Sequence, residues 1–210
     1  MKIKYNLKNV HLFPVASVNA NGSVTYETES VTNDGTTTTQ AVVIPWPGAV
    51  SIALDPQGEL TPFYADGIEY FTSNGNNGYS GPFTSAMVPD LVSEKILGDV
   101  VDGNGAYVEN SDANVKYFGM AFEFDGDTSG RRHILYKCSL TRPKVESQTK
   151  EDKIDPVTDE VNINASPVYI PALDIHSPRA RLDKDKNATA YNAWFTQAYA
   201  PQAVSQSGAG

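Results

Sequence analysis

The strongest candidate for a chemical site is the segment Asp125-Gly-Asp127-Thr-Ser129-Gly130. Its order of acidic, hydroxyl and glycine residues is similar to the start of an EF-hand loop, in which carboxylate oxygens coordinate calcium. The twelfth position of such a loop carries a glutamate, whereas here that position is Tyr136. The flanking residues also alternate as strands do. We therefore interpret the segment as a hairpin turn and expect no metal there.

A second possibility is a cysteine nucleophile activated by a histidine. Cys138 is the only cysteine, and His133 lies near it in the sequence, whereas His11 and His176 are far away. Such a pair is possible in principle, because a neighbouring base activates a thiol. Cys138 falls on the apolar side of its expected strand, however, where a thiol normally behaves as a small, inert hydrophobe.

The remaining chemical patterns are weaker still. A phosphate-binding glycine loop opens a helix, whereas the glycines at 75, 78 and 81 are followed by Pro82. Asp66 and Glu69 resemble a carboxylate pair, but on a single strand their side chains point to opposite faces. No cluster of histidine and cysteine has the spacing of a metal site. The sequence predicts a protein that is not an enzyme and needs no cofactor or metal.

Length and charge narrow the class of protein. The 210 residues suffice for one large β domain and carry a net charge of −9. This charge argues against a protein that grips nucleic acid, because phosphate contacts require lysine and arginine. No apolar run approaches the length of a membrane span, which is about 20 residues. The N-terminal MKIKYNLKNV lacks the apolar core of a signal peptide, so we expect synthesis in a reducing cytoplasm.

The segment Lys116–Pro143 organises the expected fold. Phe118, Met120, Phe122 and Phe124 alternate with smaller or polar residues, which is the period of a half-buried strand. After the turn at 125–130, the residues Ile134, Tyr136, Cys138 and Leu140 alternate in the same way. Two such runs around a glycine-rich turn predict a β-hairpin, and its apolar face requires a second layer. We expect an antiparallel β-sandwich.

The other elements follow from similar patterns. We expect strands over 11–18, 23–31, 48–55, 63–71, 79–88 and 157–165, with Pro14 marking an edge or a bulge and Pro82 a position near an edge. The sequence from Pro89 to Leu97 predicts one short flanking helix that Gly98 ends. Residues 187–199 could form a second helix, and 179–186 read as a charged surface loop. Residues 1–199 therefore form a single domain, followed by a flexible tail at 200–210.

One polar excursion cannot be buried against this core. It is rich in threonine and is either a mobile loop or a contact arm. It comprises Thr32, Asn33, Asp34, Gly35, Thr36, Thr37, Thr38, Thr39 and Gln40. Edge strands of a sandwich offer unpaired backbone groups to other chains, so a β-rich chain without catalytic residues suggests an assembly protein.

A set of short motifs carries a resemblance to a known family. In order, they are Leu54-Asp-Pro-x-Gly58, Thr61-Pro-Phe-Tyr-Ala-Asp66, Asn76-Asn-Gly-Tyr79, Val88-Pro-Asp90 with Ile96-Leu-Gly98, Phe122-Glu-Phe-Asp-Gly126, Arg131-Arg-His-x-Leu-Tyr-x-Cys138, Arg142-Pro143, Thr149-Lys-Glu-Asp152 and the Tyr191–Phe195 segment. Their ordered combination, over roughly residues 2–199, resembles the major tail proteins (tail tube subunits) of long-tailed, non-contractile bacteriophages. The segment 31–44 and the tail after Ala200 match least.

The resemblance implies hexameric rings that stack into the tail tube of a virion around a tape-measure protein. The tube would end at tail terminator and distal tail proteins, and genomic DNA would pass through its lumen without specific binding or any membrane contact. On this basis we expect Thr32–Gln40 to contact the adjacent ring. We also expect acidic side chains to line the lumen, with Glu59, Asp66, Glu69 and Glu123 as candidates.

A different class stays open at this point. A monomeric carbohydrate-binding or adhesin module of a virion would also be an acidic β-sandwich. The aromatic residues Tyr64, Tyr70 and Tyr79 could then stack on sugar rings.

Overall fold

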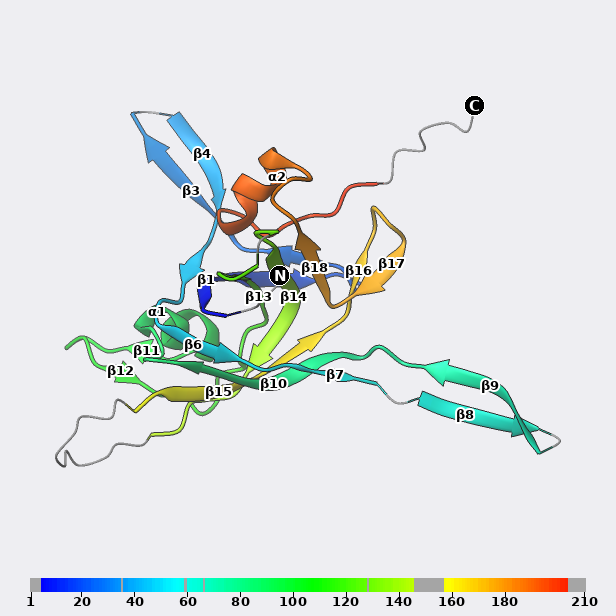
Figure 1. The fold of residues 1–210 in the computed structure, drawn as a ribbon. Helices are drawn as coiled ribbons and strands as arrows, with labels where there is room; N and C mark the ends of the chain where they lie inside the picture. The colour runs from blue at the N-terminus through cyan, green and yellow to red at the C-terminus, as the bar shows by residue number, and fades with distance from the viewer. Residues whose placement is uncertain are drawn as a thin grey trace.

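The computed structural model describes residues 5–34, 36–58, 60–65, 67–127, 129–145 and 157–203. As the sequence predicts, the chain is mainly β and its sheets are antiparallel (Figure 1). The described residues contain two short helical segments, and the sequence predicted one of them and gave the second as a possibility.

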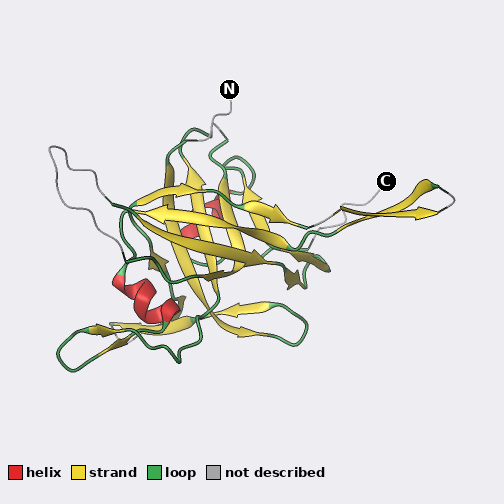
Figure 2. Cartoon of the chain, turned by 90° about the horizontal axis from the view of Figure 1, so that it is seen from below, coloured by secondary structure: helices red, strands yellow, loops and turns green. Residues whose placement is uncertain are grey.

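One sheet of ten strands forms the body. It runs in the order β2-β1-β13-β14-β15-β10-β6, with β5, β7 and β18 attached to its members. Its strands are β1 (Leu7–Val18), β2 (Val24–Tyr26), β5 (Ile44–Pro45), β6 (Ala49–Ile52), β7 (Asp55–Gln57), β10 (Gly78–Ser85), β13 (Phe118–Phe124), β14 (Arg132–Leu140), β15 (Asp159–Ser166) and β18 (Arg179–Leu182). The sheet curves over itself, so β1, β13 and β14 form one layer and β15, β10 and β6 form another (Figure 2).

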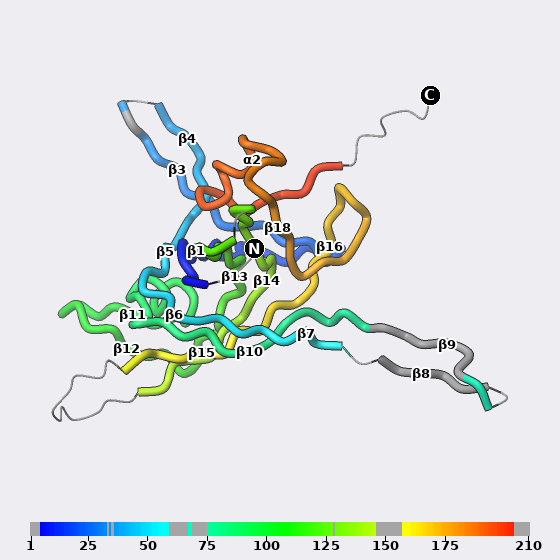
Figure 3. Tube along the Cα trace, viewed as in Figure 1, coloured from blue at the N-terminus to red at the C-terminus, as the bar shows by residue number. Residues whose placement is uncertain are grey.

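Four two-stranded hairpins are separate from this sheet. They are β3 (Thr28–Asn33) with β4 (Thr36–Ala41), β8 (Leu60–Ala65) with β9 (Ile68–Asn74), β11 (Val100–Val101) with β12 (Tyr107–Val108), and β16 (Val168–Ile170) with β17 (Ile175–Ser177). The β3–β4 and β8–β9 hairpins extend far from the body, in different directions (Figure 1). Figure 3 traces the chain through the body sheet in the same view.

The central hairpin β13–β14 confirms the predicted pairing but is covered on both faces. The faces differ from the expected ones because the register shifts between the pairs Phe118↔Cys138 and Met120↔Leu135, which places an extra residue on β14. Ile134 and Tyr136 consequently lie in a different core from Cys138. The prediction that they share one face was wrong.

The first core lies between the two layers. Large buried side chains such as Leu12, Trp46, Phe83 and Ile163 fill it. One end is closed by helix α1 (Asp90–Val92), which continues as the π-helical turn η1 (Ser93–Leu97) and ends at Gly98, whose φ of 81° suits a glycine. Val92, Ile96 and Leu97 are buried, whereas Leu91 is 49% exposed.

The second core lies on the outer face of β1, β13 and β14. Phe13, Ala121, Ile134 and Tyr136 line it. It is covered by β16 and by helix α2 (Ala188–Asn192) with its 3₁₀ extension η2 (Ala193–Phe195). Trp194 is fully buried there, and its indole nitrogen donates a hydrogen bond to the carbonyl of His133 at 3.0 Å.

Three predicted elements are corrected. Residues 179–186 do not form a simple loop, because β18 pairs with β14 while Ala180 and Leu182 pack on the second core. Residues 63–71 do not form one strand, because the chain reverses near Gly67, where φ is 77°. The expected strand 48–55 divides into β6 and β7.

Pro82 does not mark an edge. Strand β10 has β15 on one side and β6 and β7 on the other, so it lies inside the sheet. The gap between β6 and β7 lies opposite Pro82, whose carbonyl accepts a hydrogen bond from the amide of Ala53 at 3.0 Å. Proline has no N–H to donate, so the neighbouring strand is interrupted where that donor is missing.

Candidate assembly surfaces

The predicted contact segment Thr32–Gln40 forms most of the β3–β4 hairpin, which we call the threonine arm (residues 28–41). Its strands pair from Thr28↔Ala41 to Asn33↔Thr36, and Asp34 turns the chain with a φ of 50°. Gly35 lies outside the described residues, as does the side chain of Asn33. The sequence predicted a polar, strand-like excursion, and the structure shows that it is a paired ribbon (Figure 1).

The backbone pairing between β3 and β4 is the main interaction that stabilises the threonine arm. Its described threonine side chains are exposed, and the hydroxyls of Thr32 and Thr37 lie 2.9 Å apart across the ribbon. Within the described part of the chain, each of the two strands pairs with the other and with no third strand, so the outer edge of each keeps unpaired backbone groups. A two-stranded ribbon is marginally stable alone in water. The arm is therefore suited to completion by another surface.

The β8–β9 hairpin carries Glu69, one of the expected lumen carboxylates. Glu69 pairs with Tyr64 in the ladder. Glu59 and Asp66 are adjacent in sequence to β8 but lie outside the described residues, as do the side chains of Glu69, Tyr64 and Tyr70. Their orientation toward a lumen stays a prediction.

Glu123, the fourth lumen candidate, is built into the subunit. It is 9% exposed, and its carboxylate pairs with the Arg132 guanidinium at 3.0 Å and accepts a hydrogen bond from the Asn9 amide at 2.6 Å. Its charge is balanced inside the fold, so Glu123 is the weakest of the four candidates for a carboxylate that lines the lumen.

Arg132 also ties the central hairpin to the C-terminal helix. Its guanidinium carbon lies 3.8 Å from the ring centroid of Tyr191 and 4.6 Å from that of Phe195, and it donates a hydrogen bond to the Tyr191 carbonyl. Sequence reasoning missed this cluster because its members are far apart along the chain.

In the turn that resembles a calcium loop, the carboxylates of Asp125 and Asp127 accept hydrogen bonds from protein groups. Asp125 accepts hydrogen bonds from the side chains of Asn6 and Lys8, and the Lys8 bond above all lowers the pKa of that carboxyl. Asp127 accepts the amide of Ser129 at 3.0 Å. In the part of the chain that the structure describes, no group of three or more histidine, cysteine or acidic side chains is placed to hold a metal.

Cys138 is fully buried in the first core, and burial raises the pKa of its thiol well above the ordinary value. The thiolate is the reactive form, so the native protein should resist a thiol reagent such as Ellman's reagent. We expect labelling in native buffer to proceed only through unfolding and to become fast and complete in denaturing urea. Rapid stoichiometric labelling of the native protein, followed by absorbance, would contradict this burial.

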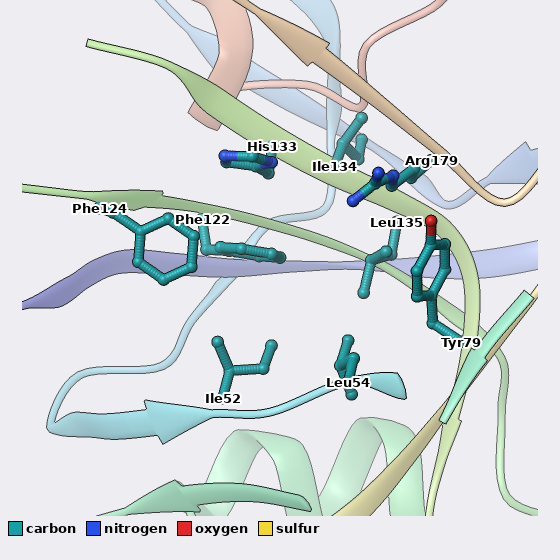
Figure 4. A pocket seen from close by; sticks show the side chains of 9 residues that line it. All are labelled: Ile52, Leu54, Tyr79, Phe122, Phe124, His133, Ile134, Leu135 and Arg179. Carbon is teal, nitrogen blue, oxygen red and sulfur yellow. The ribbon is translucent and has the colours of Figure 1, made fainter. Parts of the chain in front are cut away.

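An apolar cavity of about 180 Å³ opens between the two layers (Figure 4). Ile52 and Leu54 form one wall, and Phe122 and Phe124 form the opposite one. At one end lie Tyr79 and Arg179, whose guanidinium carbon is 4.8 Å from the Tyr79 ring centroid. Tyr79, a residue of the sugar-binding alternative, is thus partly buried and covered by a cation. Sequence reasoning missed the cavity because distant strands supply its walls.

The β11–β12 hairpin is another exposed element. Residues on both of its strands are apolar, and they are Val100 (54% exposed), Val101 (42%), Tyr107 (47%) and Val108 (50%). The chain turns between the two strands, where the Gly105 amide donates a hydrogen bond to the Asp102 carbonyl at 3.0 Å.

Comparison of the chain with protein-family models, with curated proteins and with solved structures found no match. Among the described residues, no helix has both the length and the apolar character needed to cross a membrane.

Proposed function

We propose that this protein is a structural subunit of a bacteriophage tail tube. It polymerises as stacked hexameric rings around a tape-measure protein, between tail terminator and distal tail proteins, and forms the conduit for DNA ejection. The single observation that supports this most is the threonine arm, a paired but exposed ribbon that the subunit itself leaves uncovered. The ring size and the named partners rest on the resemblance of the sequence motifs.

The borders of the body sheet offer the second support. The strand order ends at β2 on one side and at β6 on the other, and β18 pairs on one side only. Exposed edge strands normally invite pairing with another chain. In a ring of identical copies, the unpaired backbone groups of each edge strand bond to the neighbouring subunit and form an interface.

The charge of the chain fits a DNA conduit. Each copy carries −9, which repels phosphate and prevents the wall from holding the passing genome. The same charge opposes assembly, because six copies at −9 each are brought together in one ring. Salt screens this repulsion with a Debye length of about 10 Å at about 0.1 M.

Electron microscopy of the purified protein tests the proposal. We expect rings or tubes, and we expect them at lower protein concentration when the salt is raised, because screening weakens repulsion between copies. Light scattering across the same salt series gives the concentration at which polymers appear. Discrete particles of monomer size at every salt and protein concentration would overturn the proposal, and glycan affinity of such particles would favour the carbohydrate-binding alternative.

A further inference from the structure

The β11–β12 hairpin has the composition of an interface on both faces. Val100 pairs with Val108 and Val101 with Tyr107, and directly paired residues share a face of an antiparallel ribbon. Antiparallel ribbons at a protein surface usually have one polar, solvated face. Here each face carries an apolar pair that is about half exposed. The hairpin is thus an apolar projection that the subunit does not cover.

This hairpin is also held in a fixed position. At its base, Arg142 pairs with Asp99 at 2.8 Å and Glu109 at 3.1 Å and donates hydrogen bonds to the carbonyls of Leu97 and Asn110. At its tip, the Asp102 carboxylate accepts the amides of Asn104 and Ala106, both at 2.8 Å. A rigid projection loses little conformational entropy on binding, so it is preorganised for a partner.

The charges around the hairpin indicate what that partner must offer. Residues 99–112 contain four acidic residues, Asp99, Asp102, Glu109 and Asp112, and no basic one. Arg142 neutralises Asp99 and Glu109, which leaves Asp102 and Asp112, and Asp102 directly follows Val101 in the sequence. The matching surface is apolar with a cation at its rim.

The cavity between the layers has these two properties. Ile52, Leu54 and Phe122 give it apolar walls, and the exposed Arg179 places a positive charge at its end (Figure 4). Arg179 thus places a positive charge beside an apolar hollow, in a chain that is acidic as a whole. The chain therefore carries an acidic apolar projection and a basic apolar hollow.

We propose that the β11–β12 hairpin of one copy docks on this cavity of a second copy. The Val101–Tyr107 face covers the apolar walls, and Asp102 lies beside Arg179. The contact joins two different surfaces, so repetition around an axis gives a ring or an open filament. This inference rests on the proposed function for the closure of the ring, and it assigns one of the ring's interfaces.

Cysteine pairing between copies tests the contact directly. Cys138 is buried, so introduced thiols alone should react. Tyr107→Cys and Leu54→Cys, made in separate chains with tags of different size, are mixed and exposed to a mild oxidant. We expect a disulfide-linked heterodimer on a non-reducing gel at least about tenfold faster than for the mixture of Tyr107→Cys with Ile175→Cys, an exposed position on β17. Equal rates for the two mixtures would overturn the proposal.

Three further variants sharpen the result. Arg179→Glu in the Leu54→Cys chain should slow linkage by about tenfold, whereas Arg179→Lys should retain most of it, because the rim charge attracts the acidic hairpin. Ile68→Cys tests the β8–β9 hairpin as the occupant, and preferential linkage of this variant to Leu54→Cys would overturn the assignment to β11–β12. Thermal unfolding checks that each variant is folded.

The failure of this contact is distinguishable from the failure of the proposed function. Tubes in the electron microscope without preferential Tyr107→Cys linkage would refute the contact and leave the tube proposal standing. Preferential linkage with no ring or tube would support the contact and refute the tube. Neither observation would be evidence against both.

Discussion

A subunit without its threonine arm should fold normally and form no tubes. Thr28 and Ala41 are cross-strand partners, so an Asn-Gly turn between them can replace residues 29–40 and close the shortest hairpin. None of the removed residues belongs to either core, so the free energy of unfolding should change by less than about 1 kcal/mol. Electron microscopy and urea unfolding measure the two parts of the expectation.

The matched control keeps the arm and changes only its side chains. Thr32→Ser with Thr37→Ser retains both hydroxyls and the backbone ladder, so tubes should still form. If the backbone edges make the contact, the control and the parent should polymerise at similar concentrations. Long tubes formed by the truncated subunit would show that the arm is dispensable and would remove the main support for the assembly proposal.

Replacing Arg132 by alanine should destabilise the subunit by about 3–5 kcal/mol, the usual cost of breaking a buried ion pair from one side. The side chains of Arg132 and Glu123 are 17% and 11% exposed, so the Glu123 charge would lose its main partner in a poorly solvated place. The variant also loses the stacking on Tyr191 and Phe195 and the bond to the Tyr191 carbonyl. Urea unfolding monitored by tryptophan fluorescence measures the loss.

The preceding residue supplies the control for this experiment. Arg131 makes a bidentate ion pair with Asp183, but the Asp183 side chain is 24% exposed, against 11% for Glu123, so water can partly replace the lost partner. Arg131→Ala should therefore cost less than Arg132→Ala. Replacing both Arg132 and Glu123 by leucine should recover part of the loss, because no charge is then left unpaired. Equal costs for the two alanine variants would contradict the role assigned to Arg132.

The parts of the fold that the sequence predicted are those encoded by local patterns. Alternation identified the central hairpin and the strand expected over 157–165, most of which lies in β15. Pro89 and Gly98 marked the ends of the first helical segment, although Pro89 precedes the helix as its N-cap. These signals depend on neighbours within a few residues, so a single sequence contains them.

The errors arose where the structure depends on distant residues. A bulge on β14 moved Ile134 to the opposite face from the one that simple alternation predicts. The sequence of β18 is typical of a charged loop, and it forms a strand because it pairs with β14. Gly67 has a positive φ, and such a glycine is compatible with a bulge in one strand or with a turn between two strands. The cross-strand pairing of Phe63 with Phe71 shows that it forms a turn.

Among the candidate surfaces, too, the sequence predicted those encoded by neighbouring residues and missed those that distant residues form. The threonine arm was visible because nine consecutive polar or small residues cannot be buried. The cavity and the Arg132 cluster were not visible, because each gathers side chains from strands and helices far apart in the sequence. The exposure of β11–β12 could have been suspected only from its apolar residues in an acidic, glycine-containing segment.

The position of Trp194 has a consequence for how this subunit is made. A ribosome releases residues 188–195 late, so the central strands emerge well before the side chain that fills their outer face. Until then, Phe13, Ile134 and Tyr136 lack their cover, and the nascent chain presents an incomplete core. A prematurely terminated product would lack this plug altogether, and its instability would keep it from being incorporated into a growing polymer.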